Sequence, residues 1–173
     1  GRRYWQAKGL PSETTIPEVE PTEIELESFR EDSRMRFDEL VGRLDEEGLT
    51  IVDVRSTDEY DGRLTALAGY PPLAQRAGRV PGAVRAPWEH TLAEDGRFRP
   101  LEELRAHYRG LGLAEDGEVT MYCGVGVRSS HTWFVLHELL GYRGARNYDG
   151  SWAEWGSVIG APIEMPDERE AAA

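Results

Sequence analysis

The only cysteine of the chain, Cys123, lies where a nucleophile is expected. It ends an apolar, β-prone run and begins a short loop that closes at Arg128. Ser129 or Ser130 is suited to cap a following helix, and Gly141 to end it. The free amide groups at a helix start and a nearby arginine stabilise a thiolate, so the pKa of such a cysteine falls from about 8.5 to roughly 3.5–7.5. The pattern therefore predicts a reactive thiolate rather than an inert buried thiol.

The loop after the cysteine is rich in glycine, which allows the backbone to curl until successive amides face one point. Such a loop can hold an anion or a partly negative sulfur atom. The residues expected to bind the substrate there are Gly124, Val125, Gly126, Val127 and Arg128.

Two stretches of the sequence resemble a known family. The run from Tyr122 to Leu136 resembles the active-site loop of rhodanese-type sulfurtransferases, and residues 147–156 resemble the element that follows it. The resemblance is to the C-terminal catalytic domain of bacterial two-domain thiosulfate sulfurtransferases. It implies that Cys123 takes a sulfane sulfur from thiosulfate or a similar donor as a persulfide and passes it to cyanide or a thiol. It implies no cofactor and no metal.

Other functions stay open. Gly124 directly after the cysteine resembles the loop of 3-mercaptopyruvate sulfurtransferases, whereas residues 128–130 match the bacterial thiosulfate type. A regulatory or sulfur-relay module is an alternative from a non-enzyme class, although inactive modules typically lack the cysteine that this chain keeps. Cysteine phosphatases place five residues between cysteine and arginine. Here only four intervene, and this shorter cradle suits one sulfur better than a phosphate.

Composition excludes several classes. A net charge of −12 over 173 residues argues against nucleic acid or an anionic membrane surface as partner. A single cysteine excludes an internal disulfide framework and fits a reducing cytoplasm. We see no apolar run of the length of a membrane span. The length allows one ordinary domain with a sizeable core.

The resemblance also suggests how the chain is divided. Residues 1–21 resemble the end of a preceding rhodanese-like module and its linker, which implies an N-terminal half in the intact protein. Residues 22–166 form the expected catalytic domain, and residues 167–173 an expected frayed tail.

Hydrophobic patterning predicts an α/β fold, with a central five-stranded, mostly parallel sheet covered by helices on both faces. Cys123 should lie at a strand's carboxyl end, open to solvent. The strands are expected at residues 24–27, 49–55, 84–88, 119–122 and 145–148. The helices are expected around residues 37–44, 101–111, 130–140 and 152–155.

Four residues outside the loop complete the expected site. Asp53 and Arg55 end an apolar strand at the same edge as Cys123, where an ion pair that fixes loop geometry is favoured over direct catalysis. Arg76, in the long irregular stretch before Arg79, aligns with an arginine that binds the donor in relatives. Trp155 could wall the pocket.

Overall fold

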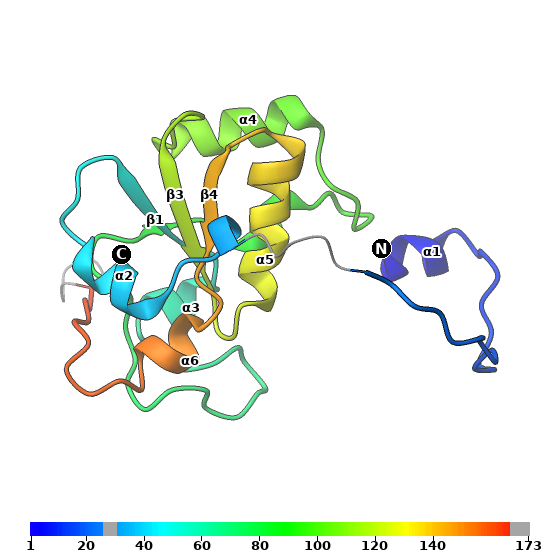
Figure 1. Ribbon diagram of the computed structural model, residues 1–173, viewed down its shortest axis with the longest axis horizontal. Helices are drawn as coiled ribbons and strands as arrows, with labels where there is room; N and C mark the ends of the chain where they lie inside the picture. Colours follow the sequence, from blue (N-terminus) through cyan, green and yellow to red (C-terminus); the bar gives the residue numbers. More distant parts are fainter. Residues whose placement is uncertain (26–30, 167–173) are drawn as a thin grey trace.

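The computed structural model describes residues 1–25 and 31–166, and its centre is a parallel sheet (Figure 1). The strands are β1 (Leu49–Asp53), β2 (Val84–Arg85), β3 (Glu118–Tyr122) and β4 (Gly144–Asn147), in the order β2-β1-β3-β4. All three pairings are parallel, and β1 aligns residue for residue with β3 from Leu49 opposite Glu118 to Asp53 opposite Tyr122. The carboxyl ends of the strands therefore meet at one edge.

The expected fifth strand is wrong for the part of the chain that the structure describes, because the sheet there has four strands. Ile24 is 81% exposed and belongs to no strand, and residues 26 and 27 lie outside the described residues. On the outer side of β4, the described residues form a single parallel bridge, between Arg34 and Asn147. A side chain left in solvent provides no burial energy to hold an added strand in place.

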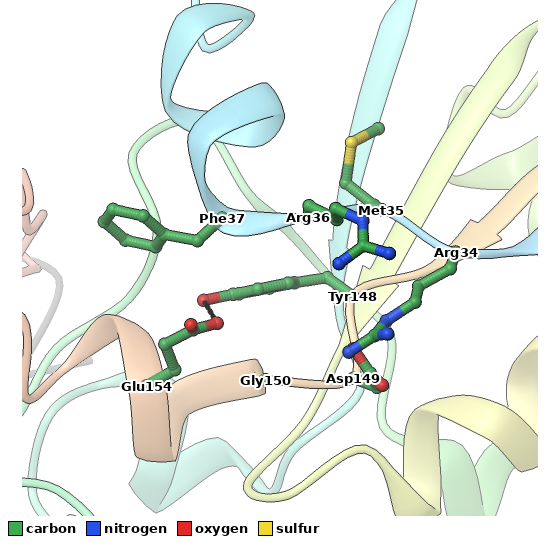
Figure 2. Close-up of a pocket in the computed structure, with 8 residues that line it drawn as sticks. All are labelled: Arg34, Met35, Arg36, Phe37, Tyr148, Asp149, Gly150 and Glu154. Carbon is green, nitrogen blue, oxygen red and sulfur yellow. Dashed lines mark hydrogen bonds and ion pairs between the residues drawn. The ribbon is translucent and has the colours of Figure 1, made fainter. Parts of the chain in front are cut away.

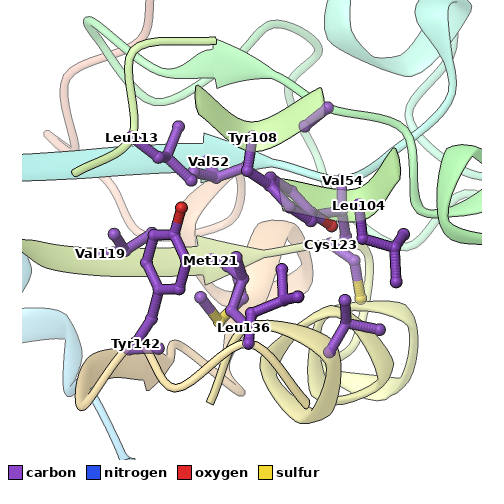
Figure 3. Packing of buried hydrophobic residues seen from close by; sticks show 14 residues of the cluster. Val52, Val54, Leu104, Tyr108, Leu113, Val119, Met121, Cys123, Leu136 and Tyr142 are labelled. Atoms are coloured by element: carbon purple, nitrogen blue, oxygen red, sulfur yellow. The ribbon is translucent and has the colours of Figure 1, made fainter. Parts of the chain in front are cut away.

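Two buried clusters cover the two faces of the sheet, since alternate side chains of each strand point to opposite sides. One cluster joins β1 and β3 to α4 (Leu101–Gly110), α5 (Val127–Trp133) and the π-helical turn η3 (Phe134–Leu139); Cys123 belongs to it (Figure 3). The other joins Ile51 and Tyr122 to α2 (Phe37–Gly42) and α6 (Ser151–Trp155). The prediction of a sheet with helices on both faces is confirmed.

The helix after the cysteine starts earlier than expected. It begins at Val127, and Gly126 takes the N-cap position with a left-handed backbone, φ 86°. Ser129 and Ser130 therefore lie in the first turn and do not cap it. Gly141 has φ 87° and follows the last residue of the π turn and its C-cap, which confirms the expected stop.

Short helical turns connect the remaining elements. They are η1 (Glu31–Ser33), α3 (Thr57–Tyr60) and η2 (Trp88–Thr91). Near the N-terminus, α1 (Arg2–Ala7) lies apart from the sheet, and the Arg97 guanidinium stacks 4.9 Å from the Tyr4 ring (Figure 1). None of the helices in the described ranges is long and apolar enough to cross a membrane.

Candidate active site

Cys123 directly follows β3, and the start of α6 holds its backbone in place. The Cys123 N–H donates to the Ser151 hydroxyl at 3.0 Å, and the Cys123 carbonyl accepts from the Trp152 N–H at 2.9 Å. Ser151 is the one non-glycine residue with positive φ, 54°, in the described chain, a conformation that costs energy and concentrates at functional sites. The cysteine is thus held by segments that follow two neighbouring strands, β3 and β4.

The thiol is closed off from solvent, which contradicts the expectation of an open nucleophile. Cys123 is 1% exposed. A Cβ built on Gly124 would meet the Leu73 side chain and the Arg128 guanidinium, each at 3.1 Å. The loop after α3 and the arginine therefore close over the loop that begins at the cysteine.

Polar groups around the thiol favour its charged form. Burial raises the pKa of Cys123, but the Ser129 hydroxyl, at 3.5 Å, and the backbone N–H groups of Ser129 and Val125 lower it. The positive charge of Arg128 adds to this, and the pKa of the thiol lies below its ordinary value. The prediction of a lowered pKa is confirmed, and the amide groups of the loop are part of the cause.

Gly126 shows why the loop needs glycine. Besides its positive φ, a Cβ at this position would lie 2.8 Å from the Asp149 carbonyl oxygen. The loop therefore packs backbone against backbone on the turn that leads into α6. This close approach brings the Val125 and Ser129 amides toward the sulfur atom.

Arg128 forms a bidentate ion pair with Glu59. Its two terminal nitrogens donate to the two Glu59 carboxylate oxygens at 2.7 and 2.8 Å, and Glu59 is 1% exposed. The same carboxylate accepts from the backbone N–H and hydroxyl of Ser56, in the capping box that begins α3. Burial raises the pKa of Glu59, but the bonds from Arg128 and Ser56 outweigh it and the pKa is lowered. Both partners are therefore charged at neutral pH.

The expected ion pair between Asp53 and Arg55 is confirmed, and it is fully buried. The Arg55 Nη2 lies 2.6 Å from the Asp53 carboxylate and also donates to the Gly78 carbonyl. Tyr122 donates its hydroxyl to Asp53 at 2.6 Å, and the Arg55 guanidinium stacks 4.5 Å from the Trp152 ring. This cluster holds the end of β1 and the end of β3, the strand that Cys123 follows.

Two other predicted site residues bond to backbone elsewhere. Arg76 donates to the carbonyls of Trp155, Gly156, Val158 and Ala161, and so anchors the segment after α6. Trp155 is fully buried in the cluster on the α2 and α6 face, where it packs against Phe37. Their parts in donor binding and in walling the site stay predictions.

Three side chains at the site were not assigned from the sequence. The sequence suggests only a capping role for Ser129, no sequence pattern reveals the positive φ of Ser151, and the patterns described above assign no role to Glu59. For Glu59 a signal existed. Ser56 and Glu59 form a capping-box pattern immediately after the strand that ends at Asp53.

A surface pocket of about 240 Å³ adjoins the turn that carries Ser151 but is not lined by Cys123 (Figure 2). Its charged groups are paired. Arg34 binds Asp149 at 2.9 Å, and the Tyr148 hydroxyl donates to Glu154 at 2.7 Å. This pocket is separate from the thiol.

Comparison with known proteins places this geometry in a family. The sequence family described as the rhodanese-like domain matches residues 37–157 of this chain. A protein of Saccharopolyspora erythraea, provisionally named a thiosulfate sulfurtransferase, is 44% identical over 99% of this chain and 60% of its own length. The sulfur carrier protein TtuD of Thermus thermophilus is 42% identical over 97% of the chain and 60% of its own length. The chain thus spans about 60% of these curated relatives.

Solved structures of other proteins share this fold. The anaerobic ergothioneine biosynthesis enzyme from Chlorobium limicola, in complex with trimethyl histidine, matches with a TM-score of 0.81 and 28% identity, over 96% of this chain and 40% of the enzyme. A structure of EanB with ergothioneine covalently linked to a persulfide cysteine matches with a TM-score of 0.83 and 27% identity, over the same shares. From fold, loop and relatives together, the chain belongs to the rhodanese-like family.

Proposed function

We propose that this protein is a sulfurtransferase that moves a sulfane sulfur from thiosulfate or a similar donor, through a persulfide on Cys123, to cyanide or a thiol. The observation that carries the proposal is the setting of the thiol. Cys123 directly follows a parallel strand, its pKa is lowered, and the Val125 and Ser129 amides and the Arg128 charge act on its sulfur. Relatives named as thiosulfate sulfurtransferases support the same reaction.

The proposed step uses the thiolate as nucleophile. The Cys123 sulfur attacks the outer sulfur of thiosulfate, the S–S bond of the donor breaks, and its electron pair leaves with sulfite. The negative charge that entered on the thiolate now lies on the outer sulfur of the persulfide. The loop amides then face that sulfur, as they would an oxyanion. A thiophilic acceptor removes the sulfur and restores the thiolate.

Two enzyme alternatives differ in donor or reaction. 3-Mercaptopyruvate is the runner-up donor, because Gly124 follows the cysteine directly. A cysteine phosphatase is less well supported, because Gly124–Val127 offers one residue fewer than a phosphate-binding loop. Thiosulfate, 3-mercaptopyruvate and p-nitrophenyl phosphate can be assayed side by side. We expect sulfur transfer from thiosulfate, weaker turnover of mercaptopyruvate and no phosphate release.

A carrier role is the alternative from another class, and the name of the Thermus thermophilus relative favours it. A carrier loads Cys123 but turns over slowly with free cyanide or small thiols, whereas an enzyme cycles. We also propose that the intact protein contains an N-terminal rhodanese-like half and acts in a reducing cytoplasm. The resemblance of residues 1–21 to the end of such a module supports the first point.

The central test is Cys123→Ser. The serine is similar in size and cannot form a persulfide, so transfer should be abolished while the fold is retained. Mass spectrometry of the unaltered protein after thiosulfate should show one added sulfur atom on the peptide that contains Cys123. Circular dichroism of the variant is the control for folding. Transfer that survives the substitution would remove Cys123 from the reaction.

A further inference from the structure

The charges around the loop are already compensated before any donor arrives. Arg128 is the charged residue of the cradle, and its guanidinium is held bidentate by the buried Glu59. Because both groups are ionised, the pair contributes no net charge. Arg128 still acts on the thiol sulfur nearby, but to an entering dianion the pair as a whole offers no uncompensated positive charge, and the dianion gains only the bonds of the amides.

The arginines of the neighbouring stretch, residues 59–79, are engaged as well. Arg63 pairs with Asp58 and Asp61, at 3.0 and 3.1 Å. Arg76 donates to four backbone carbonyls, and Arg79 pairs with Glu164. Guanidinium groups committed in this way would have to give up existing bonds to receive a donor.

The exposed rim of the loop is apolar. Val125 is 50% exposed and Val127 is 70% exposed, and Leu73 lies against Gly124. These side chains can contact an organic group at the mouth of the loop, and they offer nothing to the sulfonate oxygens of thiosulfate.

We propose that Glu59, by cancelling the charge of Arg128, sets the donor class, so that Cys123 takes sulfur from organic persulfides in preference to dianionic thiosulfate. This inference rests on the proposed function and ranks its donors. In the step, the Cys123 thiolate attacks the outer sulfur of R–S–SH. The S–S bond of the donor breaks, its electron pair leaves with R–S⁻, and the proton stays on the outer sulfur, now part of the Cys123 persulfide.

The charge accounting explains the preference. With the protonated R–S–SH one negative charge is present in the loop throughout, and with its anion two, whereas with thiosulfate three are brought together. Charges held close in a partly buried site repel strongly, because little water screens them. Removing the negative charge of Glu59 should weaken this repulsion for thiosulfate and so raise its kcat/KM. The kcat/KM for the persulfide should change less.

The test compares kcat/KM for benzyl persulfide and for thiosulfate in the full chain. The unaltered protein should favour benzyl persulfide. Glu59→Gln keeps an oxygen for Arg128 but removes the charge, and should raise the ratio of thiosulfate to persulfide about tenfold. Glu39→Gln is the matched control. Glu39 lies on α2, outside this loop, and it also binds an arginine, Arg146. Its substitution should leave the ratio unchanged.

A second variant keeps the test decisive if Glu59→Gln does not fold. Val125→Lys adds a positive charge at an exposed position and should raise the same ratio, with Val19→Lys, at an 80% exposed valine, as control. A protein that prefers thiosulfate, or a ratio that neither variant moves, would overturn the inference while leaving sulfur transfer intact. If neither donor adds sulfur to Cys123, the proposed function fails, and the inference with it.

Discussion

At the scale of single residues, the reactivity of Cys123 depends on a few short contacts. Burial alone would keep the thiol protonated, and the bonds to its sulfur reverse that effect. Ser129 contributes twice, through its hydroxyl and its backbone N–H. The hydroxyl also lies 3.1 Å from the Gly126 carbonyl, and an alanine at this position removes both hydroxyl contacts but keeps the Ser129 N–H.

We expect Ser129→Ala to raise the pKa of Cys123. A hydrogen bond to a charged group contributes on the order of 1.5–3 kcal/mol, so its loss should move the pKa upward. The rate of alkylation by iodoacetamide, followed against pH by mass spectrometry, reports the thiolate. Since the thiolate forms above the pKa, the midpoint of the rate profile should shift to higher pH.

Ser130→Ala provides the matched control for this measurement. Ser130 is the next residue and is exposed, and its hydroxyl donates to the Val127 carbonyl instead of the thiol. Its profile should coincide with that of the unaltered protein. A Ser129→Ala profile that coincides as well would mean that the amides and Arg128 alone set the pKa.

At the scale of elements, the site depends on how closely the loop before α5 approaches the turn before α6. Gly126 and Asp149 meet through their backbones, so two separate strand ends are joined. Sequence could predict this loop only in part. The glycines indicated a tight curve, but a contact with residues more than twenty positions away depends on the packing of the whole sheet.

Gly126→Ala should destabilise the protein more than Gly141→Ala does. Both glycines have φ near 87°, where an alanine costs roughly 1–2 kcal/mol. At Gly141 the new Cβ would meet nothing within 4 Å, whereas at Gly126 it would press on the Asp149 carbonyl. Overpacking adds about 1–3 kcal/mol at Gly126. Urea unfolding of the two variants gives the difference, and equal losses would show that the loop moves aside at little cost.

At the scale of the whole molecule, the buried ionic cluster of Asp53, Arg55 and Tyr122 joins segments distant in sequence. Tyr122 donates to Asp53 and accepts from the Val80 N–H at 3.1 Å. The hydroxyl thus links β3 to the end of β1 and to the chain that returns toward β2. Its burial raises the pKa of Tyr122 well above its ordinary value, so it stays protonated and can donate.

Tyr122→Phe should lower the free energy of unfolding by about 2 kcal/mol or more, because it leaves a carboxylate oxygen and an amide with one bond fewer. Tyr142→Phe is the control. The Tyr142 hydroxyl is also buried but has no hydrogen-bond partner among the described residues, so its removal should be near neutral. Thermal and urea unfolding measure both. Equal effects would show that the Tyr122 bonds contribute little.

Sequence patterns located four strands and the main helices, because apolar runs and glycine stops are local signals. The alternation at residues 24–27 predicts a strand, but Ile24 lies in solvent and belongs to no strand, and residues 26 and 27 lie outside the described residues. The patterns placed Asp53, Arg55 and Cys123 at one edge, since parallel strands end together. They did not reveal that Arg76 holds the segment after α6, because nothing local distinguishes an arginine that binds a donor from one that binds carbonyls.

The long connection of residues 59–79 is held in place by contacts with residues much further along the chain, which are synthesised later. Arg76 depends on carbonyls as far along as Ala161, and Arg79 on Glu164, with which it also forms an antiparallel bridge. On the ribosome, the thiol and its loop are synthesised well before these anchors emerge. About forty residues separate Cys123 from those anchors, which at typical elongation rates of about 5–20 residues per second is an interval of a few seconds. A chain stalled in that interval would expose its nucleophile to whatever oxidants or electrophiles the cell contains.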